Sequence, residues 1–69
     1  RLAAYLTDEY VKLGSDVIST THEQIAKNLG TAREVVSRML KYFEKEGLVA
    51  LGRGTITIKN VSGLKKLLT

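Results

Sequence analysis

Residues 21–40 have the sequence Thr21-His-Glu-Gln-Ile-Ala-Lys-Asn-Leu-Gly-Thr-Ala-Arg-Glu-Val-Val-Ser-Arg-Met-Leu40. Two helix-start signals lie ten residues apart in it. Thr21 with Gln24, and Thr31 with Glu34, each have the spacing of a capping box. Gly30 lies between them and suits a tight turn. A short helix, a glycine turn and a longer helix together are typical of a helix-turn-helix, which we therefore predict here.

The flanking residues supply the rest of the fold. The pattern predicts a helix over 1–13 ending at Gly14, a short strand over 17–20, helices over about 22–28 and 32–46, strands over 48–51 and 55–59 joined by the turn Gly52-Arg53-Gly54, and a last helix after Asn60. Three helices followed by a β-hairpin form a winged helix-turn-helix. The predicted fold class is mainly α with a small β-hairpin (α+β): a three-helix core, a wing, and a short C-terminal helix capped by Asn60.

Apolar side chains at helical spacing identify the expected core. In the first helix these are Leu2, Leu6, Tyr10 and Leu13; in the second, Ile25, Ala26 and Leu29; in the last, Leu64, Leu67 and Leu68. A chain of 69 residues has room for one domain, spanning 1–69. A domain this small buries only about 60% of the surface of its unfolded chain.

The composition narrows the classes of function. The chain is 43% hydrophobic and 26% charged, and its net charge is +4 at pH 7, which favours polyanionic partners. No apolar run approaches the roughly 20 residues of a membrane span. With no cysteine and one histidine, His22, we expect no metal site of the usual nitrogen and sulfur kind, no cofactor and no catalytic triad. Because the chain begins at Arg1 and its only methionine is Met39, we expect a piece of a longer protein.

The third helix has two unlike faces. At about 100° per residue, with Arg33 at zero, Ser37, Lys41, Glu34 and Arg38 fall between about 40° and 140°. On the opposite side, Ala32, Val36, Met39, Leu40 and Phe43 fall between about 240° and 340°. The apolar side predicts contact with the core. The polar side is then left facing outward.

The polar face has the chemistry of base recognition. An arginine can donate two hydrogen bonds to guanine, a glutamate can accept from cytosine, and a serine can serve several bases. We therefore expect Arg33, Glu34, Ser37 and Arg38 to contact DNA bases. Simpler interpretations stay open: Glu34 only closes the capping box or pairs with Arg38, and the arginines only form a solvated helix face.

At these residues the chain resembles the DNA-binding domain of the Crp/Fnr family of bacterial transcription regulators. The resemblance covers nearly the whole chain and is carried by Arg1-Leu-Ala, Thr21-His-Glu-Gln-Ile-Ala, Arg33-Glu-Val-Val-Ser-Arg38, Glu44-Lys-Glu-Gly-Leu-Val49, Arg53-Gly54, Ile56, Ile58 and Leu64. Asn60 stands where aspartate is more usual in the family, and either residue can cap a helix.

The resemblance implies residue roles. Arg38 and Glu34 would recognise a G·C pair, with Arg33 and Ser37 on neighbouring bases or phosphates. The expected phosphate contacts are Thr21, His22, Thr31, Lys41 and Arg53, the first three because helix N-termini attract anions. For His22 and Arg53 a merely solvated side chain is the simpler alternative.

The resemblance also implies partners. It predicts sequence-specific binding to double-stranded DNA at a palindromic operator whose half-site has a TGA core, in the cytoplasm of a bacterium. The homodimer would form through an upstream region outside this segment, RNA polymerase would be a further partner, and the effector of an upstream sensor stays unknown. The alternative function is a winged helix that binds proteins and not DNA.

Overall fold

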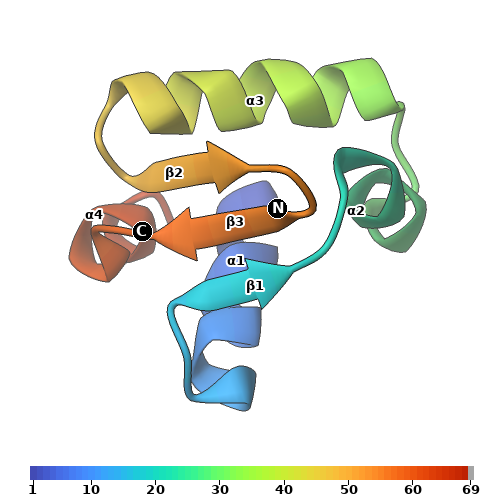
Figure 1. The fold of residues 1–69 in the computed structure, drawn as a ribbon. Coiled ribbons are helices and arrows are strands. Elements are labelled where there is room, and N and C mark those ends of the chain that lie inside the picture. The colour runs from blue at the N-terminus through green and yellow to red at the C-terminus, as the bar shows by residue number, and fades with distance from the viewer. Residues whose placement is uncertain (69) are drawn as a thin grey trace.

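The computed structural model describes residues 1–68 and has the predicted winged helix-turn-helix fold (Figure 1). Its elements are α1 Leu2–Leu13, β1 Val17–Ser19, α2 His22–Leu29, α3 Arg33–Lys45, β2 Val49–Gly52, β3 Thr55–Ile58 and α4 Val61–Lys66. The predicted order of elements is confirmed, and most boundaries move by one or two residues. In Figure 1, α3 runs along one side of the small sheet and α1 lies behind it.

Helix α2 begins and ends as its sequence predicts. Thr21 is extended, and its Oγ1 accepts a hydrogen bond from the Gln24 backbone N–H at 3.1 Å. At the other end Gly30 has a φ of 67°, a left-handed conformation that glycine adopts without strain. The N–H of Gly30 donates to Lys27 O, and the N–H of Thr31 donates to Ala26 O. This pair of bonds is a Schellman motif, and it sets the direction in which the chain leaves α2.

The predicted capping box of Thr31 with Glu34 is wrong. The N-cap of α3 is Ala32, which is extended and has no side-chain hydrogen bond to the helix. In a capping box the Glu34 side chain would accept from the Thr31 N–H, but this N–H instead donates to Ala26 O and closes α2. The carbonyl of Ala32 accepts the first bonds of α3, from the N–H groups of Val35 and Val36. The helix therefore begins at Arg33 without a capping side chain.

The wing belongs to a three-stranded antiparallel sheet of order β1-β3-β2. β2 and β3 form the predicted hairpin, in which Gly52 pairs with Thr55 across the turn residues Arg53 and Gly54. β1 joins the free edge of β3, with Ile18 opposite Ile56. Beyond that pair the Thr20 N–H donates to Gly54 O at 3.1 Å. This bond holds the tip of the hairpin beside the start of α2.

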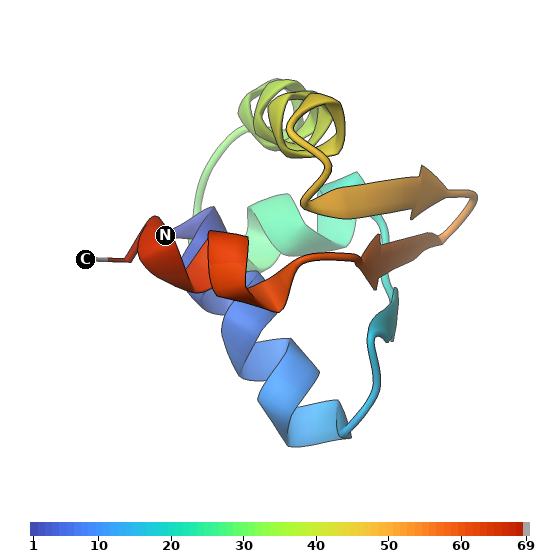
Figure 2. The same ribbon diagram turned by 90° about the vertical axis from the view of Figure 1, so that its left-hand side faces the viewer.

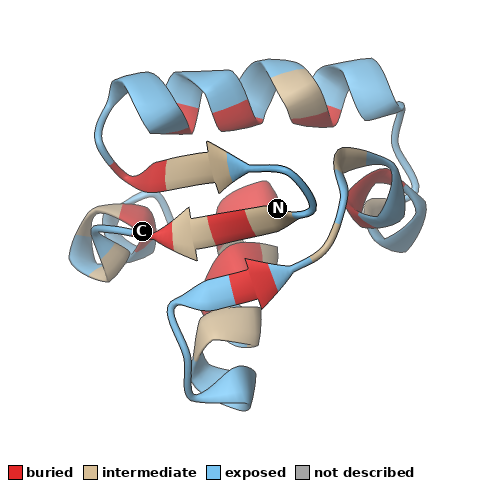
Figure 3. Cartoon of the chain, viewed as in Figure 1, coloured by how far each residue is buried: buried red, intermediate tan, exposed pale blue. Residues whose placement is uncertain are grey.

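One hydrophobic core lies between α3, the sheet and α1 (Figure 3). The buried apolar residues are Leu2, Ala3, Leu6, Ile18, Ile25, Ala26, Val36, Leu40, Phe43, Leu48, Val49, Ile56, Ile58 and Leu64. Each helix and each strand contributes at least one of them. On α3 the buried side chains are Val36, Leu40 and Phe43, so this helix turns one face to the core and leaves the other in solvent.

Several predicted core residues are exposed. Leu13, Ala32, Met39, Leu67 and Leu68 lie at the surface. Leu13 is the last residue of α1 and Leu67 follows the end of α4, so each extends past the elements that would cover it. Ala32 precedes α3, and Met39 lies at the edge of its apolar face. Helical spacing gives direction around an axis and does not show where the neighbouring element ends.

Two side chains tie α1 to α2. The Arg1 guanidinium donates to the Leu29 carbonyl at the C-terminal end of α2. The Asn28 amide donates to the Tyr5 hydroxyl at 3.4 Å. At the other end of the chain, the Asn60 side chain accepts from the Gly63 N–H at 2.9 Å, which confirms the predicted cap of α4.

Candidate nucleic-acid interface

The outward face of α3 collects the polar residues that the helical wheel predicts. A shallow depression on this face is lined by Arg33, Glu34, Ser37, Arg38 and Lys41. Ser37 is half-buried and the other four are exposed. Figure 3 shows that the side of α3 facing away from the sheet is exposed over most of its length, with one intermediate stretch. Because three cationic side chains share this face with one carboxylate, it is a positively charged surface with a single negatively charged group within it.

The Glu34 carboxylate makes no hydrogen bond or ion pair within residues 1–68. Neither simpler interpretation of this residue, the capping box or a pair with Arg38, describes its place in the structure. The carboxylate does lie in the first turn of α3, where the helix dipole favours a negative charge. The Glu34 carboxylate is therefore available to accept hydrogen bonds from a ligand. The Arg38 guanidinium, which also makes no hydrogen bond or ion pair within residues 1–68, is available to donate them.

A second depression lies where three elements meet. Thr20, Thr21, His22 and Glu23 line it from the start of α2, Arg33 from the start of α3, and Gly52 and Gly54 from the hairpin turn. Arg53, exposed at the tip between these glycines, is the charged residue of the turn. The Thr21 hydroxyl accepts its cap bond through one lone pair, so its proton remains available to donate to an anion beside the N-terminus of α2.

Thr31 lines neither of these two depressions. It lines an apolar groove with Arg1, Leu2, Leu29, Val35, Val36 and Met39, between α1 and the inner edge of α3. The prediction that Thr31 contacts phosphate rests on its place at the N-terminus of α3, and it stays a prediction, although the Thr31 N–H itself donates to Ala26 O. The other predicted phosphate contacts, Thr21, His22, Lys41 and Arg53, lie on or beside the two depressions described above.

One contact within the interface was not predicted from the sequence. His22 Nδ1 and Ser37 Oγ are hydrogen bonded at 2.9 Å. The bond joins the first residue of α2 to the outward face of α3, and both side chains are half-buried. Fifteen residues separate the two in the chain, so no local sequence signal could have revealed it.

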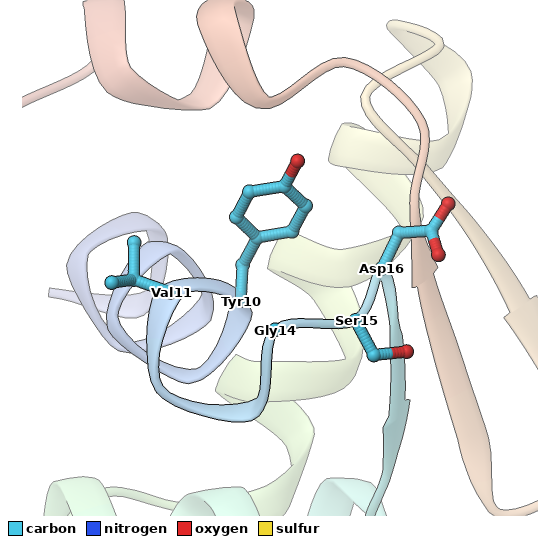
Figure 4. A pocket seen from close by; sticks show the side chains of 5 residues that line it. All are labelled: Tyr10, Val11, Gly14, Ser15 and Asp16. Carbon is cyan, nitrogen blue, oxygen red and sulfur yellow. The ribbon is translucent and has the colours of Figure 1, made fainter.

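A further depression, at the C-terminal end of α1, contains none of the predicted contact residues (Figure 4). Tyr10, Val11, Gly14, Ser15 and Asp16 line it, and Asp16 is its only charged residue. Figures 1 and 2 both place this end of α1 across the sheet from α3. It has neither the charge nor the position of a nucleic-acid site.

Among residues 1–68 there is no group of three or more histidine, cysteine, aspartate or glutamate side chains that could hold a metal ion. Within the same residues, none of the helices has the length and apolar character of a membrane span.

The helix-turn-helix fold of this chain is that of a known protein family. The family model for the Crp-like helix-turn-helix domain matches residues 1–67. The chain belongs to this family. Among its relatives, the transcriptional regulator SdrP of Thermus thermophilus is 33% identical over 54 residues, which are 78% of this chain and 27% of that protein. The transcriptional regulatory protein btr of Bordetella pertussis is 33% identical over 75 residues, covering 99% of this chain and 31% of btr.

Solved structures of the family have the same fold. A Crp/Fnr-family chain from Eubacterium rectale superimposes with a TM-score of 0.94 at 48% identity, over 97% of this Crp-like domain and 31% of that chain. The catabolite activator protein of Thermus thermophilus gives a TM-score of 0.80 at 32% identity, over 94% of the domain and 31% of that chain. The domain thus spans less than a third of each of these relatives. Its family and its relatives support a role in DNA binding and transcription regulation.

Proposed function

We propose that this Crp-like domain binds double-stranded DNA sequence-specifically, with the first two turns of α3 in the major groove. The observation that carries the proposal is the division of α3 into two faces. Val36, Leu40 and Phe43 fix one face in the core, and this leaves the polar residues on the other side directed outward. An α-helix fits the major groove, and the N-terminal residues of the second helix contact base edges in this motif.

The side chains at that end have complementary roles. In this proposal Arg38 donates two hydrogen bonds to guanine, and Glu34 accepts from the cytosine amino group. Arg33 and Ser37 flank them in the same depression and would contact adjacent bases. A carboxylate close to phosphates raises the free energy of any complex in which it accepts no hydrogen bond. Glu34 therefore discriminates against sequences that offer it no donor.

Backbone contacts would hold the helix in register. We assign four residues to phosphates: Lys41 at the far end of the α3 depression, Thr21 and His22 at the junction of α2 with the wing, and Arg53 at the tip of the hairpin. Contacts of this kind position a protein on the duplex and carry no sequence information directly. Thr31 stays a candidate phosphate contact through its exposed side chain, because its backbone N–H already donates to Ala26 O.

The longer regulator would act as a homodimer. We infer dimerisation through regions outside this chain and binding to a palindromic operator, with half-sites of TGA core about one helical turn, roughly 34–36 Å, apart. RNA polymerase would be its partner at promoters in the bacterial cytoplasm. We expect no enzymatic activity within this domain.

A salt titration separates this proposal from the alternative that the domain binds proteins and not DNA. Fluorescence anisotropy with duplex DNA is measured at several salt concentrations. We expect weak binding by the single domain and a steep fall in affinity with salt, because each neutralised phosphate releases counterions. If no binding is detected at low salt, or if the measured affinity does not depend on salt, the protein-binding alternative is favoured.

Arg53 tests the role of the wing. Arg53 lies at the tip of the hairpin, which the bond from Thr20 N–H to Gly54 O holds beside the start of α2. The Arg53→Ala substitution should therefore remove one phosphate contact. We expect affinity for all duplex sequences to fall about equally, and the slope of log affinity against log salt to become shallower by about one unit. The same titration on Lys12→Ala, which removes an exposed lysine from the C-terminal end of α1, is the matched control and should leave the slope closer to that of the parent. An altered base preference in Arg53→Ala would show that it contacts a base.

A further inference from the structure

The hydrogen bond between His22 and Ser37 lies inside the surface that we assign to DNA. Ser37 belongs to the depression on α3, and His22 belongs to the neighbouring depression at the start of α2. The 2.9 Å contact between Nδ1 and Oγ is the side-chain hydrogen bond that links the two. Both residues are partly buried, so water competes less for this bond than it would at a fully exposed site.

We propose that His22 is a positioning residue that makes Ser37 selective among bases. This inference rests on the proposed function and adds a residue from α2 to its specificity. A free serine hydroxyl has one proton to donate and two lone pairs that accept, and it can rotate to suit either kind of base edge. Serine alone is therefore a weak discriminator.

The bond to His22 removes one of these options. If Nδ1 carries no proton, the Ser37 hydroxyl donates to it and presents only its lone pairs to the DNA. If Nδ1 carries a proton, it donates to Ser37 Oγ, and the hydroxyl proton is left for an acceptor on a base. In both cases the bond fixes the Ser37 rotamer and uses one hydrogen-bonding position of Oγ. With Nδ1 as the acceptor, the hydroxyl can only accept from a base; with Nδ1 as the donor, it keeps its proton and one lone pair in a fixed direction. In each state fewer base edges suit Ser37 than would suit a free serine.

Two replacements of His22 separate this role from a phosphate contact. In His22→Asn, the terminal amide occupies about the place of Nδ1 and can still bond Ser37. In His22→Gln, the amide lies one bond farther out, about where Nε2 lies, and can still reach a phosphate. Ser37→Ala removes the hydroxyl itself. Comparison of these variants shows whether a change in specificity follows the bond or only the presence of a polar side chain.

The experiment is selection of bound sequences from a pool of random duplexes at low salt, followed by anisotropy on the selected sites and their single-base variants. We expect His22→Gln and Ser37→Ala each to reduce discrimination at the same single base position by about 3- to 10-fold, as for the loss of one hydrogen bond. The double variant should show no further loss there, whereas His22→Asn should keep most of the parental preference. Thermal unfolding followed by circular dichroism confirms that each variant is folded.

Three other outcomes are informative. If His22→Gln lowers affinity for every sequence equally and leaves base preference unchanged, His22 is only a phosphate contact or a brace between helices, and the inference is wrong. If His22→Asn loses discrimination as fully as His22→Gln, the bond to Ser37 is not the cause, and the inference is again wrong. If the parent domain binds no duplex or selects no sequence, the proposed function itself fails, a result that differs from both.

Discussion

Leu40→Ala is expected to destabilise the domain by about 2–5 kcal/mol, because removal of a fully buried leucine loses apolar contacts and leaves a cavity. Leu40 is 0% exposed and lies at the centre of the buried face of α3. A domain of this size has a total free energy of unfolding of roughly 3–10 kcal/mol. The variant should therefore lose much of its stability, and part of the population should be unfolded at 25 °C. Urea unfolding followed by circular dichroism measures the change.

Met39→Ala is the matched control for that prediction. Met39 precedes Leu40 on the same helix and is 41% exposed, so its replacement should have a much smaller effect on the free energy of unfolding. The comparison tests the direction in which α3 faces. If Met39→Ala were as destabilising as Leu40→Ala, the helix would be rotated relative to the structure, and the outward face would not be the one described above.

The apolar face of α3 shows both the power and the limit of sequence patterns. The wheel placed Val36, Leu40 and Phe43 between about 280° and 340°, and these three are buried. It placed Met39 at about 240°, inside the same apolar sector, yet that side chain is largely exposed. The period of a helix gives direction alone. How wide a sector is covered depends on where α1 and the sheet end, and no local pattern contains that information.

Features set by neighbouring residues can be predicted from the sequence, whereas contacts between distant segments cannot. Caps and glycine turns are local, so Thr21, Gly30 and Asn60 were assigned correctly. Thr31 carries an equally good local signal but is used instead to close α2, because neighbouring helices compete for the same residues. The pairing of β1 with β3 and the bond of His22 to Ser37 join distant segments. Such contacts follow from the packed fold and have no signature in either segment alone.

Arg38→Ala is expected to have the largest effect on specific recognition. Arg38 lies in the depression with Glu34, four residues earlier on the same face of α3, and makes no ion pair within residues 1–68. No hydrogen bond or ion pair within residues 1–68 has to be broken for the Arg38 guanidinium to reach guanine. Loss of a bidentate contact to a base should cost about 1–3 kcal/mol against the correct site and little against random DNA. The exposed position means that the fold should be retained.

Lys41→Ala serves as the comparison for Arg38→Ala, because both remove one positive charge from the same depression. If Lys41 contacts a phosphate, its replacement should weaken selected and random duplexes about equally. Arg38→Ala should instead reduce the ratio between the two affinities. This difference separates a lost base contact from a lost charge, which a measurement on one duplex cannot do.

The central claim is that α3 recognises the DNA sequence. Its most direct test is the affinity of folded Arg38→Ala, relative to the parent, for an operator selected by the parent and for a random duplex at the same salt concentration. The account predicts that affinity for the operator falls by about 5- to 150-fold, the equivalent of 1–3 kcal/mol, while affinity for the random duplex changes little. If folded Arg38→Ala binds the selected operator as tightly as the parent does, α3 is not the helix that recognises the sequence.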